Sequence, residues 1–309
     1  MFKFLQDVII KLLKGVVEQL RRIKKNDEER HKTQNLSTET KIDTSGKIYN
    51  VIETSEVSTP TEETKQIVTK RRNIMTNKTI YNRKVYMLID QSGSMSRTDA
   101  LYNDKRRWNA IAESIEGHVY KILSQKDIMK DQKICDEIIV TFFSPNSPSK
   151  ATRYINDSSQ VGDIFEEYGP ESTTFLAPTF QKIVEQWFGT RDQNEGGFII
   201  IYTDGEIDDR DAFVNSVGET CRKLNNQEEL KVVIIGFGSD VNRKPEFYLK
   251  LDANMKSFKD RNSNPCNIVV FDLLNKMDDG IINLLRRQLE DPKAGLPEWG
   301  KEFCPDLYD

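Results

Sequence analysis

The sequence predicts an α/β protein in which a doubly wound, mostly parallel sheet is flanked by helices. Short apolar segments without clear polar alternation recur between residues 81 and 290, as expected of strands that are covered on both faces. Longer segments lie between them, and their apolar residues repeat every three or four positions, as in helices packed against a sheet. Elements that alternate in this way favour one domain with parallel strands.

Composition and charge narrow the function classes. A chain of 309 residues is long enough to bury a sizeable core. Its 45 basic and 49 acidic residues give a net charge of −4, so the chain lacks the basic field that attracts nucleic acid, and no nucleic-acid partner is expected. The four cysteines are scattered and form no C-x-x-C pair, which favours a reducing, cytoplasmic setting over a disulfide framework or a zinc site.

Residues 1–25 are predicted to form a basic amphipathic helix. Its apolar stripe consists of Phe2, Leu5, Ile9, Leu12, Val16, Leu20 and Ile23. Charged residues interrupt the apolar run, so neither a secretory signal nor a membrane-spanning helix is indicated. Three interpretations of the stripe stay open: association with a partner helix or a second copy, peripheral contact with an anionic membrane, and packing against the chain's own domain.

Residues 26–80 are predicted to be a mostly disordered linker. They are rich in Thr, Ser, Glu and Lys, and their isolated apolar residues follow no period. A flexible chain of about 50 residues has a root-mean-square reach of roughly 40 Å, so the N-terminal helix would engage a partner away from the main domain. Two segments, 47–52 and 66–68, are candidate edge or partner-bound strands.

The domain expected at 81–290 begins with the apolar run Val85–Asp90, which is followed by a polar loop at 96–104. Continuous apolar or β-branched runs predict strands at 85–90, 137–143, 198–203, 231–236 and 267–271, and a short antiparallel strand at 151–155. Helical periodicity predicts helices at 105–124, 161–168, 180–189, 211–224, 246–251 and 278–289. The proline-containing tail, 291–309, is expected to wrap the surface of the domain.

Oxygen-bearing side chains follow two of these strands and precede one helix. The three groups are Asp90, Ser92 and Ser94; Thr173 and Thr174; and Thr203 and Asp204. Because parallel strands end at the same edge of a sheet, we expect these groups to meet there. Hard oxygen ligands select Mg²⁺, with Mn²⁺ or Ca²⁺ as alternatives. Carboxylates and hydroxyls in this number leave a coordination position for an outside ligand.

The segments Asp90-Gln91-Ser92-Gly93-Ser94 and Thr203-Asp204-Gly205, together with Thr174, resemble the metal-ion-dependent adhesion site of von Willebrand factor type A (VWA) domains. This resemblance implies Ser92, Ser94 and Thr174 as ligands that bind the ion directly or through water. It places Asp90 and Asp204 mostly behind bound water, with a partner carboxylate completing the shell. Ser172-Thr173 stands where intracellular relatives commonly have two glycines, so Thr173 stays an alternative to Thr174.

The resemblance implies a non-catalytic, metal-dependent module that captures an Asp or Glu of another protein in an intracellular assembly or regulatory system. Its TerY-like type suggests kinases, phosphatases or MoxR-type ATPases as partner classes. Two alternatives remain. The first is a Mg²⁺-dependent phosphohydrolase with Asp90 as nucleophile, which is weakened because Ser92 stands where dehalogenase-type phosphatases have a second aspartate. The second is a membrane-tethered scaffold that uses the N-terminal helix.

Two further sets of residues receive structural interpretations from the sequence. Asp208, Asp209 and Asp211 are interpreted as a solvated helix start, where carboxylates favour the positive end of the helix dipole. Trp108 and Trp187 lie on apolar helix faces, and we expect them in the core.

Overall fold

The computed structural model describes the residues 78–144, 152–171, 173–205, 207–254, 256–277, 280–290 and 295–308, and the backbone of 40–42 and 48–50. The chain divides into two compact units, Met1–Arg71 and Arg72–Asp309. In the first unit, β1 (Thr40–Ile42) pairs antiparallel with β2 (Ile48–Asn50), within the segment predicted as a linker. The predicted N-terminal helix, 1–25, and the candidate strand 66–68 lie outside the described residues.

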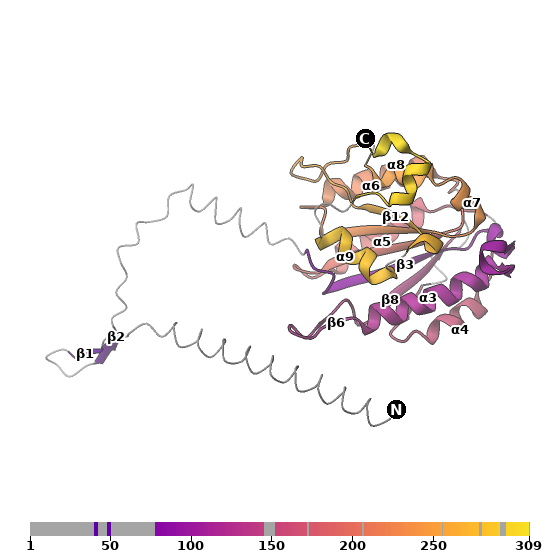
Figure 1. The fold of residues 1–309 in the computed structure, drawn as a ribbon. Coiled ribbons are helices and arrows are strands. Elements are labelled where there is room, and N and C mark those ends of the chain that lie inside the picture. Colours follow the sequence, from indigo (N-terminus) through magenta and orange to yellow (C-terminus); the bar gives the residue numbers. More distant parts are fainter. Residues whose placement is uncertain are drawn as a thin grey trace, which may run out of the picture. The chain divides into compact units, whose positions relative to one another are not determined.

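The second unit is built on a six-stranded sheet with the order β12-β11-β10-β3-β8-β9 (Figure 1). Its strands are β3 (Arg83–Asp90), β8 (Ile138–Phe143), β9 (Arg153–Ile155), β10 (Gly196–Thr203), β11 (Leu230–Gly236) and β12 (Val269–Leu273). Neighbouring strands are parallel except for β8 and β9, which pair antiparallel. The predicted doubly wound, mostly parallel α/β fold is therefore confirmed.

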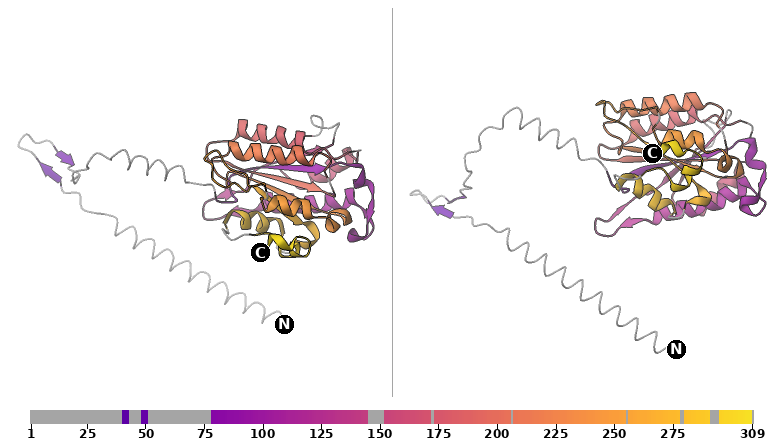
Figure 2. Two further views of the ribbon diagram at one scale, coloured as in Figure 1. Left: turned by 90° about the horizontal axis from the view of Figure 1, so that it is seen from above. Right: turned by 45° about the horizontal axis from the view of Figure 1, so that its top comes forward.

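Helices cover both faces of the sheet, and the side chains of β3 alternate between two cores. Met87 and Ile89 pack with α3 (Arg107–Ser124), α4 (Gln160–Glu167) and α9 (Gly280–Glu290). Tyr86 and Leu88 belong to the core formed with α5 (Ala177–Thr190), α6 (Arg210–Lys223) and α8 (Glu246–Asp252). The left view of Figure 2 shows α5 and α6 side by side along one face. No helix among the described residues is long and apolar enough to span a membrane.

The register of the central strands places their carboxyl ends at one edge. Ile201 of β10 lies beside Leu88 of β3, and Tyr202 lies beside Ile89. On the other side of β3, Asp90 lies beside Phe143 of β8. The groups that follow β3 and β10 are thus brought together by backbone pairing, as expected for parallel strands.

Several short elements were not predicted from the sequence. The polar loop after β3 contains η1 (Gly93–Ser96), β4 (Thr98–Asp99), η2 (Ala100–Tyr102) and β5 (Lys105–Arg106). The hairpin β6 (Lys126–Asp127) and β7 (Gln132–Lys133) follows α3, α7 (Ser239–Arg243) follows β11, and η3 (Leu274–Lys276) follows β12. All are too short to show a hydrophobic period.

The described part of the C-terminal tail packs on the domain through aromatic residues. It contains η4 (Glu298–Glu302) and η5 (Pro305–Leu307). The ring of Trp299 packs edge-to-face with that of Phe271, and the two ring centroids are 5.8 Å apart. The indole nitrogen of Trp299 donates a hydrogen bond to Asp272. The other two tryptophans, Trp108 and Trp187, are buried in the two cores, as predicted.

Candidate metal site at the carboxyl edge of the sheet

Asp90 ends β3 and is completely buried at the edge of the sheet. Its Oδ1 accepts a hydrogen bond of 2.8 Å from the backbone amide of Ser92, so the side chain closes a turn directly after the strand. Its Oδ2 accepts a hydrogen bond of 2.9 Å from the hydroxyl of Thr203 at the end of β10. Both oxygens are therefore fixed, one by the chain that follows and one by the neighbouring strand.

Ser92, Ser94 and Asp204 extend this arrangement. The hydroxyl oxygens of Ser92 and Ser94 are hydrogen-bonded at 2.9 Å, and the Ser94 hydroxyl donates to Oδ1 of Asp204 at 2.8 Å. Asp204 follows β10 directly and is 2% exposed. Four of the five predicted ligands thus form one hydrogen-bonded group with Thr203, drawn from two strand ends that are more than a hundred residues apart in sequence.

The fifth predicted ligand, Thr174, precedes α5 and is held by the segment after β10. Its backbone amide donates to Oδ2 of Asp208 at 2.9 Å, and its carbonyl accepts from the amide of Asp208 at 2.9 Å. The side chain of Thr174 is 8% exposed, whereas Thr173 is exposed. Thr174 is therefore the inward-facing member of the pair, and Ser172 lies outside the described residues.

The structure places Asp209 directly before α6, Asp211 in its first turn and Asp208 exposed, as expected of a solvated helix start, but Asp208 and Asp209 also bind the threonine loop. Besides the contact of Asp208 with Thr174, the carboxylate of Asp209 accepts hydrogen bonds from the amides of Leu176 and Ala177 at 3.0 and 2.8 Å. These amides lie at the start of α5, where helical backbone donors have no partner within the helix. The two aspartates consequently tie the threonine loop to the segment that carries Asp204, while Asp211 is exposed in the first turn of α6.

Burial makes the two carboxylates costly to ionise. Desolvation and, to a smaller extent, the nearby charge of Asp204 raise the pKa of Asp90 well above its ordinary value, although hydrogen bonds from Ser92 and Thr203 oppose this shift. Desolvation also raises the pKa of Asp204, although Arg107 and Ser94 oppose the shift. A divalent cation at this point would favour both charged forms, so the electrostatics fit a metal site.

Arg107, the first residue of α3, contacts this group and was not identified from the sequence. It is 3% exposed, and its Nη1 donates to Oδ2 of Asp204 and Oδ2 of Asp240, both at 2.9 Å. Its Nε donates to Oδ2 of Asp99 at 2.8 Å. Burial lowers the pKa of Arg107, but the hydrogen bonds and charges of these carboxylates outweigh it and raise the pKa overall.

The donor set matches a hard cation rather than a transition metal. Among the described residues, no group of three or more His, Cys, Asp or Glu side chains is placed to hold a metal. The candidate site instead combines two carboxylates with serine and threonine hydroxyls, which suits Mg²⁺ with water in the remaining positions. The ring of His118 has another partner, because its Nδ1 is hydrogen-bonded to the hydroxyl of buried Tyr202 at 2.8 Å.

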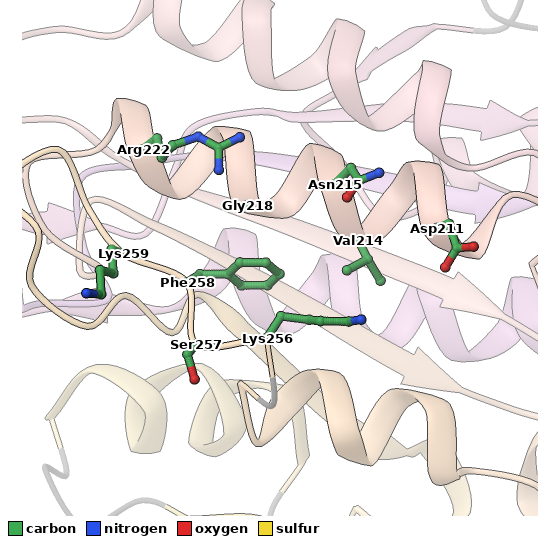
Figure 3. Close-up of a pocket in the computed structure, with 9 residues that line it drawn as sticks. All are labelled: Asp211, Val214, Asn215, Gly218, Arg222, Lys256, Ser257, Phe258 and Lys259. Carbon is green, nitrogen blue, oxygen red and sulfur yellow. The ribbon is translucent and has the colours of Figure 1, made fainter.

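A separate groove of about 660 Å³ lies between α6 and the segment 256–259 (Figure 3). Arg222, Lys256 and Lys259 give it positive charge. Its floor includes Gly218, where an added Cβ would come within 2.9 Å of the ring of Phe258. None of the predicted metal ligands lines this groove, so it is distinct from the candidate metal site.

Comparisons with known proteins yield structural neighbours only. No family model matches the sequence, and no curated protein matches it. The vWF domain of the pili tip protein Mfa5 from Porphyromonas gingivalis is 18% identical over 41% of this chain and 39% of that chain, with a TM-score of 0.31. Manganese-loaded TRAP from Plasmodium vivax is 16% identical over 68% of this chain and 73% of that chain, with a TM-score of 0.42.

Proximal thread matrix protein 1 from the mussel byssus, described with a zinc-occupied MIDAS motif, is 13% identical over 66% of this chain and 47% of that chain, with a TM-score of 0.39. The chain thus spans less than half the length of the Mfa5 and mussel proteins. At such identities and TM-scores, the function has to be inferred from the residues of this chain.

Proposed function

We propose that this chain is a non-catalytic, metal-dependent protein-binding module of the VWA type. The supporting observation is the group of buried Asp90, Ser92 and Asp204 with half-buried Ser94, in which carboxylates and hydroxyls from two strand ends are hydrogen-bonded together. With Thr174, these residues would hold Mg²⁺, with Mn²⁺ or Ca²⁺ as alternatives. When bound, the ion supplies a Lewis-acidic position for an Asp or Glu carboxylate of another protein.

The residues have distinct roles in this proposal. Ser92, Ser94 and Thr174 supply neutral hydroxyl ligands, and Asp204 is already paired with Arg107, so the chain itself would not fully neutralise a divalent ion. Asp90 and Asp204 supply negative charge from behind, because hydrogen bonds to Ser92, Thr203 and Ser94 already fix their oxygens. A site of this kind attracts an anion from outside.

The same geometry disfavours the phosphohydrolase alternative. A nucleophilic aspartate needs an oxygen free to attack phosphorus, whereas both oxygens of Asp90 accept hydrogen bonds within the protein. Burial lowers the pKa of His118 to about 4, and its Nδ1 is hydrogen-bonded to Tyr202, so this residue is not available as a base beside Asp90. Binding without turnover is therefore the better proposal.

The rim of the site favours a protein partner. Leu101 and Phe175 are large apolar residues that are 46% and 40% exposed. Leu101 lies two residues after Asp99, whose carboxylate pairs with Arg107, and Phe175 directly follows Thr174. Both therefore belong to loops that carry the site, and they would pack against apolar residues on either side of a partner carboxylate.

The cellular role belongs to this proposal as well. We place the module in an intracellular, TerY-like regulatory or assembly system, in a cytoplasmic setting and without nucleic acid as partner. The N-terminal helix, 1–25, would add self-association, a partner helix or peripheral membrane contact. Flotation of the full-length protein with anionic vesicles tests the membrane-tethered alternative, and equal recovery of a chain that begins at Lys78 would reject it.

The proposed function is tested by calorimetric titration with MgCl₂ and by pull-downs in Mg²⁺ or EDTA. We expect Asp90→Ala and Ser94→Ala to weaken Mg²⁺ binding at least about tenfold and to abolish Mg²⁺-dependent capture of a partner. Ser96→Ala is the matched control, because this exposed hydroxyl donates only to the carbonyl of Gly93. Partner binding that survives both EDTA and Asp90→Ala would contradict the mechanism, and phosphoester turnover abolished by Asp90→Asn would revive the phosphohydrolase.

A further inference from the structure

Arg107 is held in a fixed orientation from one side by Asp99. The Oδ2 of Asp99 accepts from Nε of Arg107 and from the amide of Ser239, both at 2.8 Å. Its Oδ1 accepts from the hydroxyl of Ser239 at 2.6 Å and from the amide of Leu101 at 3.1 Å. With both oxygens occupied, Asp99 cannot turn away, so the planar guanidinium has one anchored edge.

Gly238 makes room for this guanidinium. Its φ is +86°, a region that residues with a side chain rarely adopt, and an added Cβ would lie 2.9 Å from Nε of Arg107. Its amide is hydrogen-bonded to the hydroxyl of Tyr102 at 3.2 Å. The backbone after β11 is thus shaped around Arg107, which goes beyond what one opportunistic ion pair would require.

The other edge of the guanidinium determines the orientation of the Asp204 carboxylate relative to the candidate metal position. Arg107 occupies Oδ2 of Asp204, while Ser94 occupies Oδ1. The plane of this carboxylate is therefore fixed, and only the oxygen that contacts Ser94 faces the remaining predicted ligands. A carboxylate held in this way cannot rotate to bring both oxygens to one ion.

We infer that Arg107 is a positioning residue that sets the metal preference of the site, an inference that rests on the proposed metal-binding function. Mg²⁺ accepts few protein oxygens in strict octahedral geometry, whereas Ca²⁺ takes six to eight and readily accepts both oxygens of a carboxylate. Because Arg107 keeps Asp204 from turning both oxygens towards the ion, this carboxylate would stay behind bound water. Mg²⁺ retains such water, whereas Ca²⁺ more readily takes a bidentate carboxylate, so Arg107 disfavours Ca²⁺. Asp240, which is 35% exposed, is a third carboxylate partner of Arg107, and its own charge is shared with Arg97 and Arg243.

The test compares Mg²⁺ and Ca²⁺ affinities of the full-length protein by calorimetry. Arg107→Met frees Oδ2 of Asp204, and we expect the affinity for Ca²⁺ relative to Mg²⁺ to rise at least about tenfold. A purely structural arginine would weaken the binding of both ions alike and leave this ratio unchanged. Asp240→Asn is the matched control, because it removes the negative charge of another partner of the same Nη1 but keeps the contact with Asp204. Its ratio should equal that of the wild type.

Folding of each variant is verified by circular dichroism and thermal melting. If Arg107→Met is unfolded, Arg107→Lys replaces it, because a single ammonium cannot hold both Asp99 and Asp204 in the planar geometry, and the ratio should still shift towards Ca²⁺. An unchanged ratio in a folded Arg107 variant would overturn the inference while leaving the proposed function intact. A wild-type protein that binds neither ion would instead overturn the proposed function.

Discussion

Two arginines are buried at opposite ends of the central strands, and different groups hold them. Arg83 begins β3 and is 2% exposed, and its guanidinium donates to the backbone carbonyls of Thr79, Gly197 and Glu228. Arg107 is 3% exposed at the carboxyl edge and donates to three carboxylates. Burial lowers the pKa of Arg83 to about 9, whereas the carboxylates raise that of Arg107 despite its burial.

This difference shows that burial of a charge does not by itself mark a functional residue. Arg83 packs over the ring of Phe198, 4.7 Å from its centroid, donates to backbone carbonyls at the amino end of the sheet, and is affected by the charge of Glu228 only enough to offset part of the lowering of its pKa. Arg107 is surrounded by carboxylates that include a predicted metal ligand. The chemical nature of the hydrogen-bond partners, rather than the degree of burial, therefore distinguishes the structural Arg83 from the positioning residue Arg107.

Replacement of each arginine by methionine gives the largest expected effect. Arg107→Met leaves carboxylates without their buried cation and should lower the free energy of unfolding by about 3–5 kcal/mol. Arg83→Met leaves carbonyl acceptors unpaired and should cost about 1–3 kcal/mol. Urea unfolding followed by circular dichroism measures both, with exposed Arg106→Met as a near-neutral control. If Arg83→Met lowered the free energy of unfolding as much as Arg107→Met does, the two arginines would not differ in the way proposed.

The glycines that accommodate the two arginines provide a smaller, more selective test. An added Cβ at Gly196 would lie 2.7 Å from Cζ of Arg83, and one at Gly238 would lie 2.9 Å from Nε of Arg107. We expect Gly196→Ala and Gly238→Ala each to cost roughly 1–3 kcal/mol of stability. Only Gly238→Ala should also alter Mg²⁺ affinity, measured by calorimetry. A change in Mg²⁺ affinity in the Gly196→Ala variant would contradict the view that the residues at the amino end of the sheet have a structural role only.

The two ends should also respond to opposite ends of the pH scale. Lys231 of β11 donates to the carbonyl of Asn267, and burial lowers its pKa from 10.5 to about 8. Between these values the unfolded chain binds more protons than the native protein, so stability should rise as the pH increases from about 8 to 10.5. Lys231→Met should flatten this dependence of the unfolding free energy on pH, measured by urea unfolding. An unchanged slope would show that the lowered pKa of Lys231 is not its cause.

At the carboxyl end the expected change occurs in acid. Burial raises the pKa of Asp99, but hydrogen bonds from Ser239, Leu101 and Arg107 outweigh it and hold the pKa at about 2. Because the native carboxylate resists protonation, its contribution to stability is present above pH 4 and is lost as the pH falls from about 4 to 2. Asp99→Asn should reduce this acid sensitivity relative to the wild type. If stability fell equally steeply with pH in the variant and the wild type, the acid sensitivity could not be attributed to Asp99.

The smallest expected effect comes from an exposed cation beside the site. Arg97 is 67% exposed in its side chain and lies 3.7 Å from Asp240. Since exposed ion pairs contribute little, Arg97→Ala should change stability by less than about 0.5 kcal/mol. It should also leave the Ca²⁺ to Mg²⁺ preference unchanged in calorimetry. A shift comparable to that of Arg107→Met would show that net charge, rather than the fixed orientation of Asp204, controls the preference.

The strands and most of the candidate site could be predicted because their signals are local. The apolar run before Asp90 identifies a buried strand, and the hydroxyls after it identify the donor chemistry. The partners of Arg107 lie at 99, 204 and 240, and no local pattern connects them. A weak signal was its place at the start of α3, where the helix dipole disfavours a cation unless other groups compensate.

The second role of Asp208 and Asp209 could not be predicted for a related reason. Carboxylates before a helix usually serve that helix, and only the tertiary structure shows that Asp208 also binds the amide of Thr174 and that Asp209 binds the amides of Leu176 and Ala177. The short α7 after β11 has too few residues for a hydrophobic period. The roles of the N-terminal helix and of the linker stay predictions.

The placement of β3 between β8 and β10 has a consequence for synthesis of the protein. Asp90 receives its hydrogen bond from Thr203, a residue 113 positions later in the chain. At a translation rate of about 5–20 residues per second, roughly 6 to 23 s separate the two residues on the ribosome. During that interval one side of β3 has no strand partner, and its apolar surface is open to aggregation or to chaperones. Assembly of the candidate site therefore has to be a late event in the biogenesis of this domain.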